Sequence, residues 1–278
     1  MKAILVLCAL SLTAAAPAVK HPAFSYDRSR PLALRLGAED ANGGIVRQTL
    51  SFDAGHGRKS AYWTHPQGSG PWPVVLFSPG YGGTARDQLP DADRLARKGF
   101  ASLTLAPPGS LLSCRSSQDV RSYANYVVGR RRALDLLPSL RGADESRVAA
   151  VGFSFGSAVT AALAGVDHRI RGAAIQSGRA HLSAGIRSAC TRLGSKRLRA
   201  YLRSYSAIDP VHYVGRAVPV SLFFQNGTRD PVSPKKDVDA YVRAASQPKE
   251  ARTYDAEHEL DAAATADLDD WLVELLRR

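Results

Sequence analysis

The segment Gly152-Phe153-Ser154-Phe155-Gly156 follows the G-x-S-x-G pattern, in which the serine can act as a nucleophile. Residues 147–151 before it form a short apolar run typical of a buried strand, and residues 157–164 after it are small and suit a helix. A strand, a sharp turn and a helix present a serine hydroxyl above a sheet, and the glycines leave room for strand and helix to pass closely. We therefore predict that Ser154 is an acyl-transfer nucleophile, with an ordinary strand-to-helix turn as the alternative.

A serine hydroxyl needs a base to take its proton, and that base is most often a histidine held by a carboxylate. The pattern places both residues after the serine, where the candidate histidines are His168, His181, His212 and His258. His258 is the predicted base because it follows a short candidate strand, residues 252–254, and precedes the last helix. His168 lies at the far end of the elbow helix, roughly 20 Å from Ser154 at 1.5 Å per residue, which excludes it as the direct base.

The carboxylate is expected in a loop that follows a late strand. Asp230 is the predicted residue, since it follows the strand over residues 218–224 and lies in a turn shaped by Gly227 and Pro231. Its alternative role is that of a helix-capping or turn aspartate. Asp209 is the second candidate for the carboxylate, although it precedes that strand.

Acyl transfer also needs two backbone N–H groups directed at the developing negative charge. One is expected from Phe155, directly after the nucleophile, and the other from Tyr81 in the loop Pro79-Gly80-Tyr81-Gly82-Gly83. This loop follows a strong apolar strand over residues 73–78. A plain glycine turn is the alternative for this loop.

Strands and helices alternate along the chain around these residues. Apolar runs predict strands over residues 45–52, 59–65, 73–78, 100–105, 170–175 and 218–224. Helical spacing predicts helices over residues 91–98, 122–137, 235–245 and 261–276, while residues 19–44 give no clear assignment. This order predicts an α/β fold with a mainly parallel central sheet, helices on both faces, and the chemistry at the carboxyl ends of the strands.

Residues 179–208 interrupt the alternation with a basic, moderately helical segment. A short cap beside the active site and a surface excursion without function are both open readings of it. Cys190 lies in the middle of this segment, and Cys114 is the other cysteine outside the N-terminal stretch. In an exported protein such a pair is a candidate disulfide, and two unpaired thiols are the alternative.

The first residues resemble a targeting segment. Lys2 precedes an apolar run over residues 3–12, which is too short to span a bilayer, and small residues follow over 13–18. We therefore expect residues 1–18 to be a signal peptide, residues 19–278 to form one domain, and the protein to be secreted or periplasmic. We interpret the formal net charge of +12 as a contribution to solubility, because no nucleic-acid-binding motif accompanies it.

Taken in this order, the motifs resemble the α/β-hydrolase superfamily, and most closely its dienelactone-hydrolase-like and cutinase-like exported esterases. The matching segments are residues 74–83, 95–100, 152–156, 227–232 and 257–258. The resemblance implies an α/β-hydrolase fold, a triad of Ser154, Asp230 and His258, and an oxyanion hole formed by Tyr81 and Phe155. Here the nucleophile stands between two phenylalanines, which departs from the cysteine elbow of dienelactone hydrolases and the His-Ser-Met of many cutinases.

The expected function is that of a serine hydrolase that cleaves carboxylic esters through an acyl-enzyme, without metal or cofactor. A small or lipid-like ester is the expected substrate, with no nucleic-acid partner and no stable membrane insertion. The alternatives are a peptidase or acyltransferase on the same triad, and a non-catalytic binding protein of the same fold. The natural substrate and the oligomeric state are left open.

Overall fold

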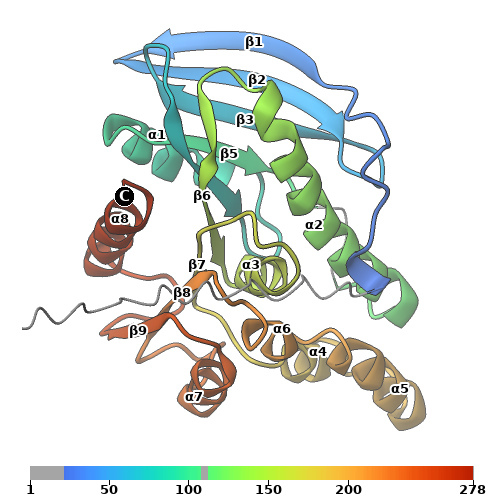
Figure 1. Ribbon diagram of the computed structural model, residues 1–278. Helices are drawn as coiled ribbons and strands as arrows, with labels where there is room; N and C mark the ends of the chain where they lie inside the picture. Colours follow the sequence, from blue (N-terminus) through green and yellow to red (C-terminus); the bar gives the residue numbers. More distant parts are fainter. Residues whose placement is uncertain (1–21, 108–111, 278) are drawn as a thin grey trace, which may run out of the picture.

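A single nine-stranded sheet organises the chain in this computed structural model, which describes residues 22–107 and 112–277 (Figure 1). The strand order is β1-β2-β3-β5-β4-β6-β7-β8-β9. The strands are β1 (Arg35–Asn42), β2 (Ile45–Asp53), β3 (Arg58–Pro66), β4 (Trp72–Ser78), β5 (Ala101–Leu105), β6 (Ala143–Phe153), β7 (Gly172–Gln176), β8 (Ser221–Gly227) and β9 (Lys249–Tyr254). Strands β4 to β9 pair in parallel, and β1 to β3 add an antiparallel extension beyond β5, so the predicted mainly parallel α/β sheet is confirmed.

Helices cover both faces of the sheet (Figure 1). They are α1 (Leu89–Arg97), α2 (Ser116–Leu136), α3 (Phe155–Val166), α4 (Leu182–Ala189), α5 (Ser195–Ser206), α6 (Val211–Val214), α7 (Lys235–Ala244) and α8 (Ala262–Leu276), with 3₁₀ turns at Pro22–Phe24, Arg86–Gln88 and Leu137–Ser139. Helices α1 and α8 pack on one face, and α2, α3, α6 and α7 pack on the other. The crossover from β4 to β5 therefore lies on the α1 face, whereas the later crossovers through α2, α3, α6 and α7 lie on the other face.

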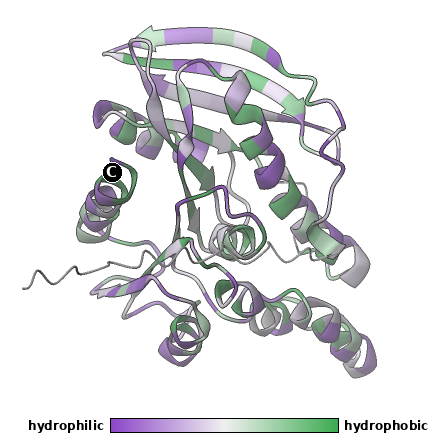
Figure 2. Ribbon diagram, viewed as in Figure 1, coloured by the Kyte–Doolittle hydropathy of each residue, from purple (hydrophilic) through white to green (hydrophobic). Residues whose placement is uncertain are grey.

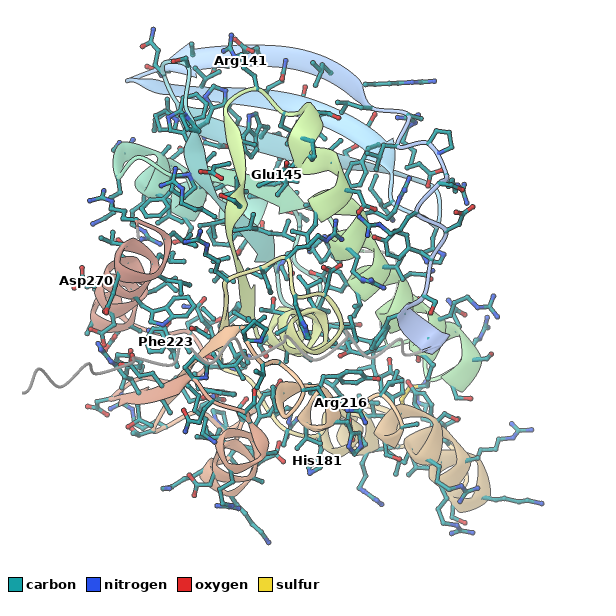
Figure 3. All side chains as sticks on the ribbon, viewed as in Figure 1. Arg141, Glu145, His181, Arg216, Phe223 and Asp270 are labelled. Atoms are coloured by element: carbon teal, nitrogen blue, oxygen red, sulfur yellow. A yellow bond between two sulfur atoms is a disulfide. The ribbon has the colours of Figure 1, made fainter. Side chains whose placement is uncertain are left out.

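Strand β4 shows how the sequence builds this core. All seven of its residues are buried, and successive side chains point to opposite faces. Val74 and Leu76 join the cluster beneath α2 and α3, whereas Val75 and Phe77 join the cluster beneath α1 and α8. On the α8 face, Phe223 of β8, labelled in Figure 3, stacks on Trp271 with ring centroids 5.3 Å apart.

Several elements differ from the sequence prediction, and two of them, β1 and α2, show why. Strand β1 lies in the unassigned segment, and all eight of its residues are exposed, so it carries no apolar alternation that could have predicted it (Figure 2). Helix α2 begins at Ser116, six residues before the predicted start. Its first turn is polar, and Asp119 in that turn accepts hydrogen bonds from the Ser113 N–H and hydroxyl at 2.8 and 2.7 Å.

Residues 179–208 fold into α4 and α5, which pack over α2 and α3. The predicted disulfide between Cys114 and Cys190 is present, with Cα atoms 5.6 Å apart. A second tie lies close by, since the Tyr201 hydroxyl of α5 donates to Asp119 at 2.5 Å. Both ties fasten the α4–α5 segment to the start of α2.

Breaking this bridge should cost substantial stability. The bridge closes a loop with a sequence separation of 76. Replacing both cysteines by serine is expected to lower the free energy of unfolding by about 4 kcal/mol, because the unfolded chain regains loop entropy. Denaturant unfolding of the two proteins measures this difference.

Thiol titration of the denatured, unreduced mature protein is the companion measurement. No reactive thiol is expected, because the predicted removal of residues 1–18 also removes Cys8. Two reactive thiols per chain would show that Cys114 and Cys190 are not bridged.

The predicted signal peptide, residues 1–18, lies outside the described residues. Within residues 22–107 and 112–277, no helix combines the length and the hydropathy needed to cross a bilayer.

Candidate active site

Ser154 occupies a strained turn between β6 and α3. Its backbone angles are φ 53° and ψ −117°, a left-handed region that costs free energy for any residue other than glycine. The flanking glycines make the turn possible: a Cβ at position 152 would overlap with the backbone of Gly156, and one at 156 would overlap with the carbonyl of Ser78. The serine therefore stands at the carboxyl end of β6, half-buried, above the centre of the sheet.

A hydrogen-bonded chain runs from Ser154 through His258 to Asp230. His258 Nε2 lies 2.8 Å from Ser154 Oγ, and His258 Nδ1 lies 2.8 Å from Asp230 Oδ2. The ring of Phe153 packs against the imidazole with centroids 5.2 Å apart. The structure thus brings together the three residues that the sequence predicts as nucleophile, base and carboxylate.

Asp230 is held so that it can orient the histidine. Its side chain is fully buried, and its second oxygen, Oδ1, accepts N–H bonds from Val232 at 2.7 Å and Ser233 at 3.0 Å. Oδ2 is left for the imidazole. A carboxylate that accepts from Nδ1–H leaves Nε2 without a proton, and Nε2 can then accept the serine proton.

Backbone contacts join the two loops that carry Asp230 and His258. The N–H groups of Thr228 and Arg229 donate to the carbonyls of Tyr254 and Ala256 at 2.8 and 3.0 Å. Gly227 lies so close to residues 256 and 257 that any Cβ there would overlap with their carbonyls. This close approach explains why a glycine ends β8 just before the carboxylate turn.

Ser177 adds a further tie that the sequence analysis did not identify. It follows β7 with φ 49°, and its hydroxyl donates to the carbonyl of His258 at 2.6 Å. Its own carbonyl accepts from the Ser233 hydroxyl at 2.9 Å. Ser177 therefore links the histidine loop to the carboxylate turn. Its place at the carboxyl end of a parallel strand is the signal that could have indicated it.

The proposed oxyanion loop lies against the elbow. A Cβ at Gly80 would lie 3.2 Å from the Ser154 Cβ, so the loop backbone passes directly beside the nucleophile. Tyr81 and Phe155, the two predicted N–H donors, line the same pocket as Ser154. Among the described residues, neither backbone N–H donates to another backbone group. Both remain available to a developing oxyanion.

Two buried side chains of α2, Tyr126 and Arg130, support this loop, and no sequence motif predicted either of them. The Tyr126 hydroxyl donates to the carbonyl of Pro79 at 2.8 Å. Arg130, 1% exposed, donates to Ser78 Oγ at 2.9 Å and to the Leu105 carbonyl at 3.0 Å, and its guanidinium stacks on the Tyr126 ring. Burial raises the pKa of Tyr126 to about 12, so its hydroxyl keeps the proton that it donates.

Removing the Tyr126 hydroxyl should slow ester hydrolysis by loosening the oxyanion loop. Tyr126→Phe leaves the Pro79 carbonyl without its buried donor, and we expect kcat to fall roughly 5- to 30-fold with little change in KM, on the order of 1–2 kcal/mol. Tyr123→Phe is the matched control, because the Tyr123 hydroxyl donates to Ala158 within α3 at 2.9 Å. Equal kcat values for the two variants would contradict a role of Tyr126 in positioning the loop.

A pocket of about 220 Å³ opens beside Ser154. Its walls are mainly apolar and come from the oxyanion loop, α3, α4 and the carboxylate turn. The lining includes Tyr81, Leu112, Phe155, Ala158, Leu182, Ile186 and Val232. Helix α4 of the 179–208 segment therefore forms one wall of the pocket.

The other candidate histidines and the alternative carboxylate lie in different surroundings. His168 Nε2 contacts the Arg216 carbonyl at 3.3 Å, and His212 Nε2 contacts the Ser206 carbonyl at 2.9 Å.

His181, labelled in Figure 3 beside α4 and α6, pairs with Asp209 at 3.4 Å. Asp209 also accepts from the Ser183 N–H and hydroxyl at the start of α4, and burial raises its pKa. Asp209 thus holds the N-terminus of α4 and does not contact His258.

A larger hollow, about 470 Å³, lies at the opposite edge of the sheet, near the start of β6. Its three arginines pair with Asp135, as Arg169 does at 2.6 Å. It contains no candidate nucleophile, and the chemistry of such sheets collects at the other edge. In the described part of the chain, no group of three His, Cys, Asp or Glu side chains is arranged to bind a metal ion.

Comparison with known proteins identifies the family to which the chain belongs. The family model described as esterase FrsA-like matches residues 11–183, more than half of the chain. The chain belongs to the FrsA-like esterase family. It is 28% identical over 214 residues to esterase FrsA of Escherichia coli O157:H7, covering 70% of this chain and 50% of that protein. The chain thus spans about half the length of this curated relative, and the family match ends before Asp230 and His258.

Solved structures agree on the fold. Acetyl xylan esterase 1 from Thermoanaerobacterium sp. JW/SL YS485 superposes with a TM-score of 0.79 at 17% identity, over 91% of both chains. The acetyl xylan esterase from Paenibacillus sp. R4 gives a TM-score of 0.74 at 19% identity, over 89% of this chain and 90% of the other. Together with the family match, this likeness confirms the predicted α/β-hydrolase fold.

Proposed function

We propose that this protein is an exported serine hydrolase that cleaves small carboxylic esters through an acyl-enzyme on Ser154. The observation that carries the proposal is the hydrogen-bonded chain from Ser154 Oγ to His258 and on to Asp230, with both contacts at 2.8 Å. The FrsA-like esterase family supports the ester as the substrate class. The two proposed N–H donors beside the nucleophile supply the remaining part of an acyl-transfer site.

The proposed reaction proceeds in two halves. Ser154 Oγ attacks the ester carbonyl carbon while His258 Nε2 takes the hydroxyl proton, and the N–H groups of Tyr81 and Phe155 bind the oxyanion. The tetrahedral intermediate then collapses, and the alcohol leaves with the proton from Nε2. Water next attacks the acyl-enzyme with His258 again as the base, which releases the carboxylic acid and restores the serine.

The volume of the pocket supports a small substrate, and the 179–208 segment supplies one of its walls. The pocket volume of about 220 Å³ is below the range of about 300–1,000 Å³ that drug-sized ligands occupy. Helix α4 supplies Leu182 and Ile186 to its wall, and on this ground we assign the segment the role of a short cap. Disulfides such as Cys114–Cys190 persist in oxidising compartments. The proposed signal peptide over residues 1–18 would direct the chain to such a compartment.

An assay of purified protein tests this function. We expect turnover of p-nitrophenyl acetate and butyrate, much slower turnover of a peptide p-nitroanilide, and no loss of activity with a chelator, because the proposed chemistry uses the triad alone. Preferential cleavage of the anilide would indicate a peptidase, and activity that a chelator removes and zinc restores would contradict the metal-free mechanism. Mass spectrometry of protein recovered from the periplasm or medium tests the removal of residues 1–18.

A further inference from the structure

The pocket beside Ser154 contains a charge that the proposed ester hydrolysis does not use. Of the described side chains that line the pocket, Arg179 is the only charged one. It stands among apolar neighbours, including Leu182 and Ile186 of α4. A cation in an apolar wall costs desolvation free energy unless it meets a partner. The wall of the pocket therefore combines one positive charge with apolar surface.

Arg179 is only partly satisfied by the protein itself. Its side chain is 19% exposed, and its Nε is buried without a hydrogen-bond partner in the described structure. The nearest carboxylate contact is Asp237 Oδ2, which lies 3.6 Å from Nε, beyond hydrogen-bond distance. That same oxygen faces the backbone N–H of His181 at 3.5 Å. The guanidinium thus retains donor capacity inside the pocket.

The chain places this guanidinium in the same pocket as Ser154. Arg179 follows the carboxyl end of β7, the strand that pairs directly with the nucleophile strand β6. Ser177, two residues earlier, is fixed by its hydrogen bond to the His258 carbonyl. A substrate held at Ser154 therefore has Arg179 within the same pocket of about 220 Å³.

From these contacts we propose that Arg179 binds a carboxylate on the substrate, so that the preferred substrates are esters bearing a negative charge. This inference rests on the proposed ester hydrolysis. Arginine suits the role because its planar guanidinium can donate two parallel hydrogen bonds to a carboxylate. Asp237 lies near the guanidinium without saturating it, and a substrate carboxylate supplies a hydrogen-bond acceptor.

Two matched ester pairs measure this preference and show which part of the ester carries the charge. Mono(4-nitrophenyl) glutarate against 4-nitrophenyl valerate tests a carboxylate on the acyl side. The compound 3-acetoxybenzoate against 3-acetoxybenzamide tests a carboxylate on the alcohol side. We expect the wild-type protein to favour the anionic member of at least one pair in kcat/KM. Arg179→Met should lower that anionic-to-neutral ratio roughly 10- to 100-fold, mainly through KM, as for a lost hydrogen bond between charged groups.

Three further variants separate recognition from general effects. Arg187→Met removes an exposed positive charge from α4, within the same 179–208 segment, and it should leave the ratio unchanged. Arg179→Lys should keep part of the preference, because the charge stays but the forked geometry is lost. Asp237→Asn should maintain or raise the preference, since it removes the competing carboxylate.

The outcomes distinguish this inference from the function on which it rests. If the wild type and Arg179→Met hydrolyse the neutral esters and show equal anionic-to-neutral ratios of kcat/KM, the role of Arg179 is overturned and the esterase function stands. An equal fall of the ratio in Arg187→Met would also overturn it, because the net charge of +12 would then attract anions without a specific site. Failure of the wild type to hydrolyse any of the four esters would overturn both.

Discussion

Replacing Ser154 by alanine is expected to lower kcat for p-nitrophenyl acetate by a factor on the order of 10⁴–10⁶, with little change in stability. The reason is that the substitution removes the only atom that forms the acyl-enzyme bond. His258 Nε2 then has no hydroxyl at 2.8 Å from which to take a proton. What rate remains would come from the oxyanion donors and from binding.

The fold of the Ser154→Ala protein is the control for this result. Alanine tolerates the φ of 53° no better than serine, so the strain of the turn stays and the melting temperature should shift by only a few degrees. Circular dichroism and thermal unfolding measure this. A well-folded Ser154→Ala protein with a nearly wild-type rate would mean that ester hydrolysis takes place elsewhere on the chain.

The second large effect is expected at His258 and Asp230. His258→Ala should cost nearly as much as Ser154→Ala, because the three residues act as one unit. Asp230→Asn should lower kcat by a factor on the order of 10⁴, since an amide in place of the carboxylate at 2.8 Å from Nδ1 favours the wrong imidazole tautomer. Steady-state kinetics on p-nitrophenyl butyrate gives both values.

Matched controls for this pair exist in the same chain. Asp209→Asn and His181→Ala alter the second candidate for the carboxylate and the histidine that it contacts at 3.4 Å, at the start of α4. We expect changes of less than about tenfold in kcat for both, because neither contacts His258. If Asp209→Asn were as damaging as Ser154→Ala while Asp230→Asn were nearly silent, the assignment of the carboxylate would be wrong.

The sequence predicted the parts of this molecule whose local pattern is strong. Only glycine fits at positions 152 and 156 of the elbow, and the apolar runs 45–52 and 73–78 match β2 and β4 to within a residue at each end. The positions of Asp230 and His258 followed from chain order and from strand ends. Their hydrogen-bonded geometry, by contrast, could be seen only in the structure.

The parts that sequence could not predict depend on contacts between distant residues. Strand β1 is exposed throughout and is defined by its backbone pairing with β2. Tyr126 and Arg130 read as ordinary helix residues, and only the packing of α2 beneath the oxyanion loop gives them their role. In the sequence, Arg179 is likewise one basic residue among many, and only the packing of α4 beside it shows that it lines the pocket.

Covalent labelling of the nucleophile tests the central claim most directly. The full-length protein is treated with a fluorophosphonate, which transfers its phosphonyl group to an activated serine with loss of fluoride, and is then measured by intact mass and peptide mapping. We predict one adduct per chain, located on Ser154, absent from Ser154→Ala and slowed at least 10³-fold in His258→Ala. A folded protein that takes up no label, or one that carries the label on another residue, would contradict the assignment of Ser154 as the nucleophile.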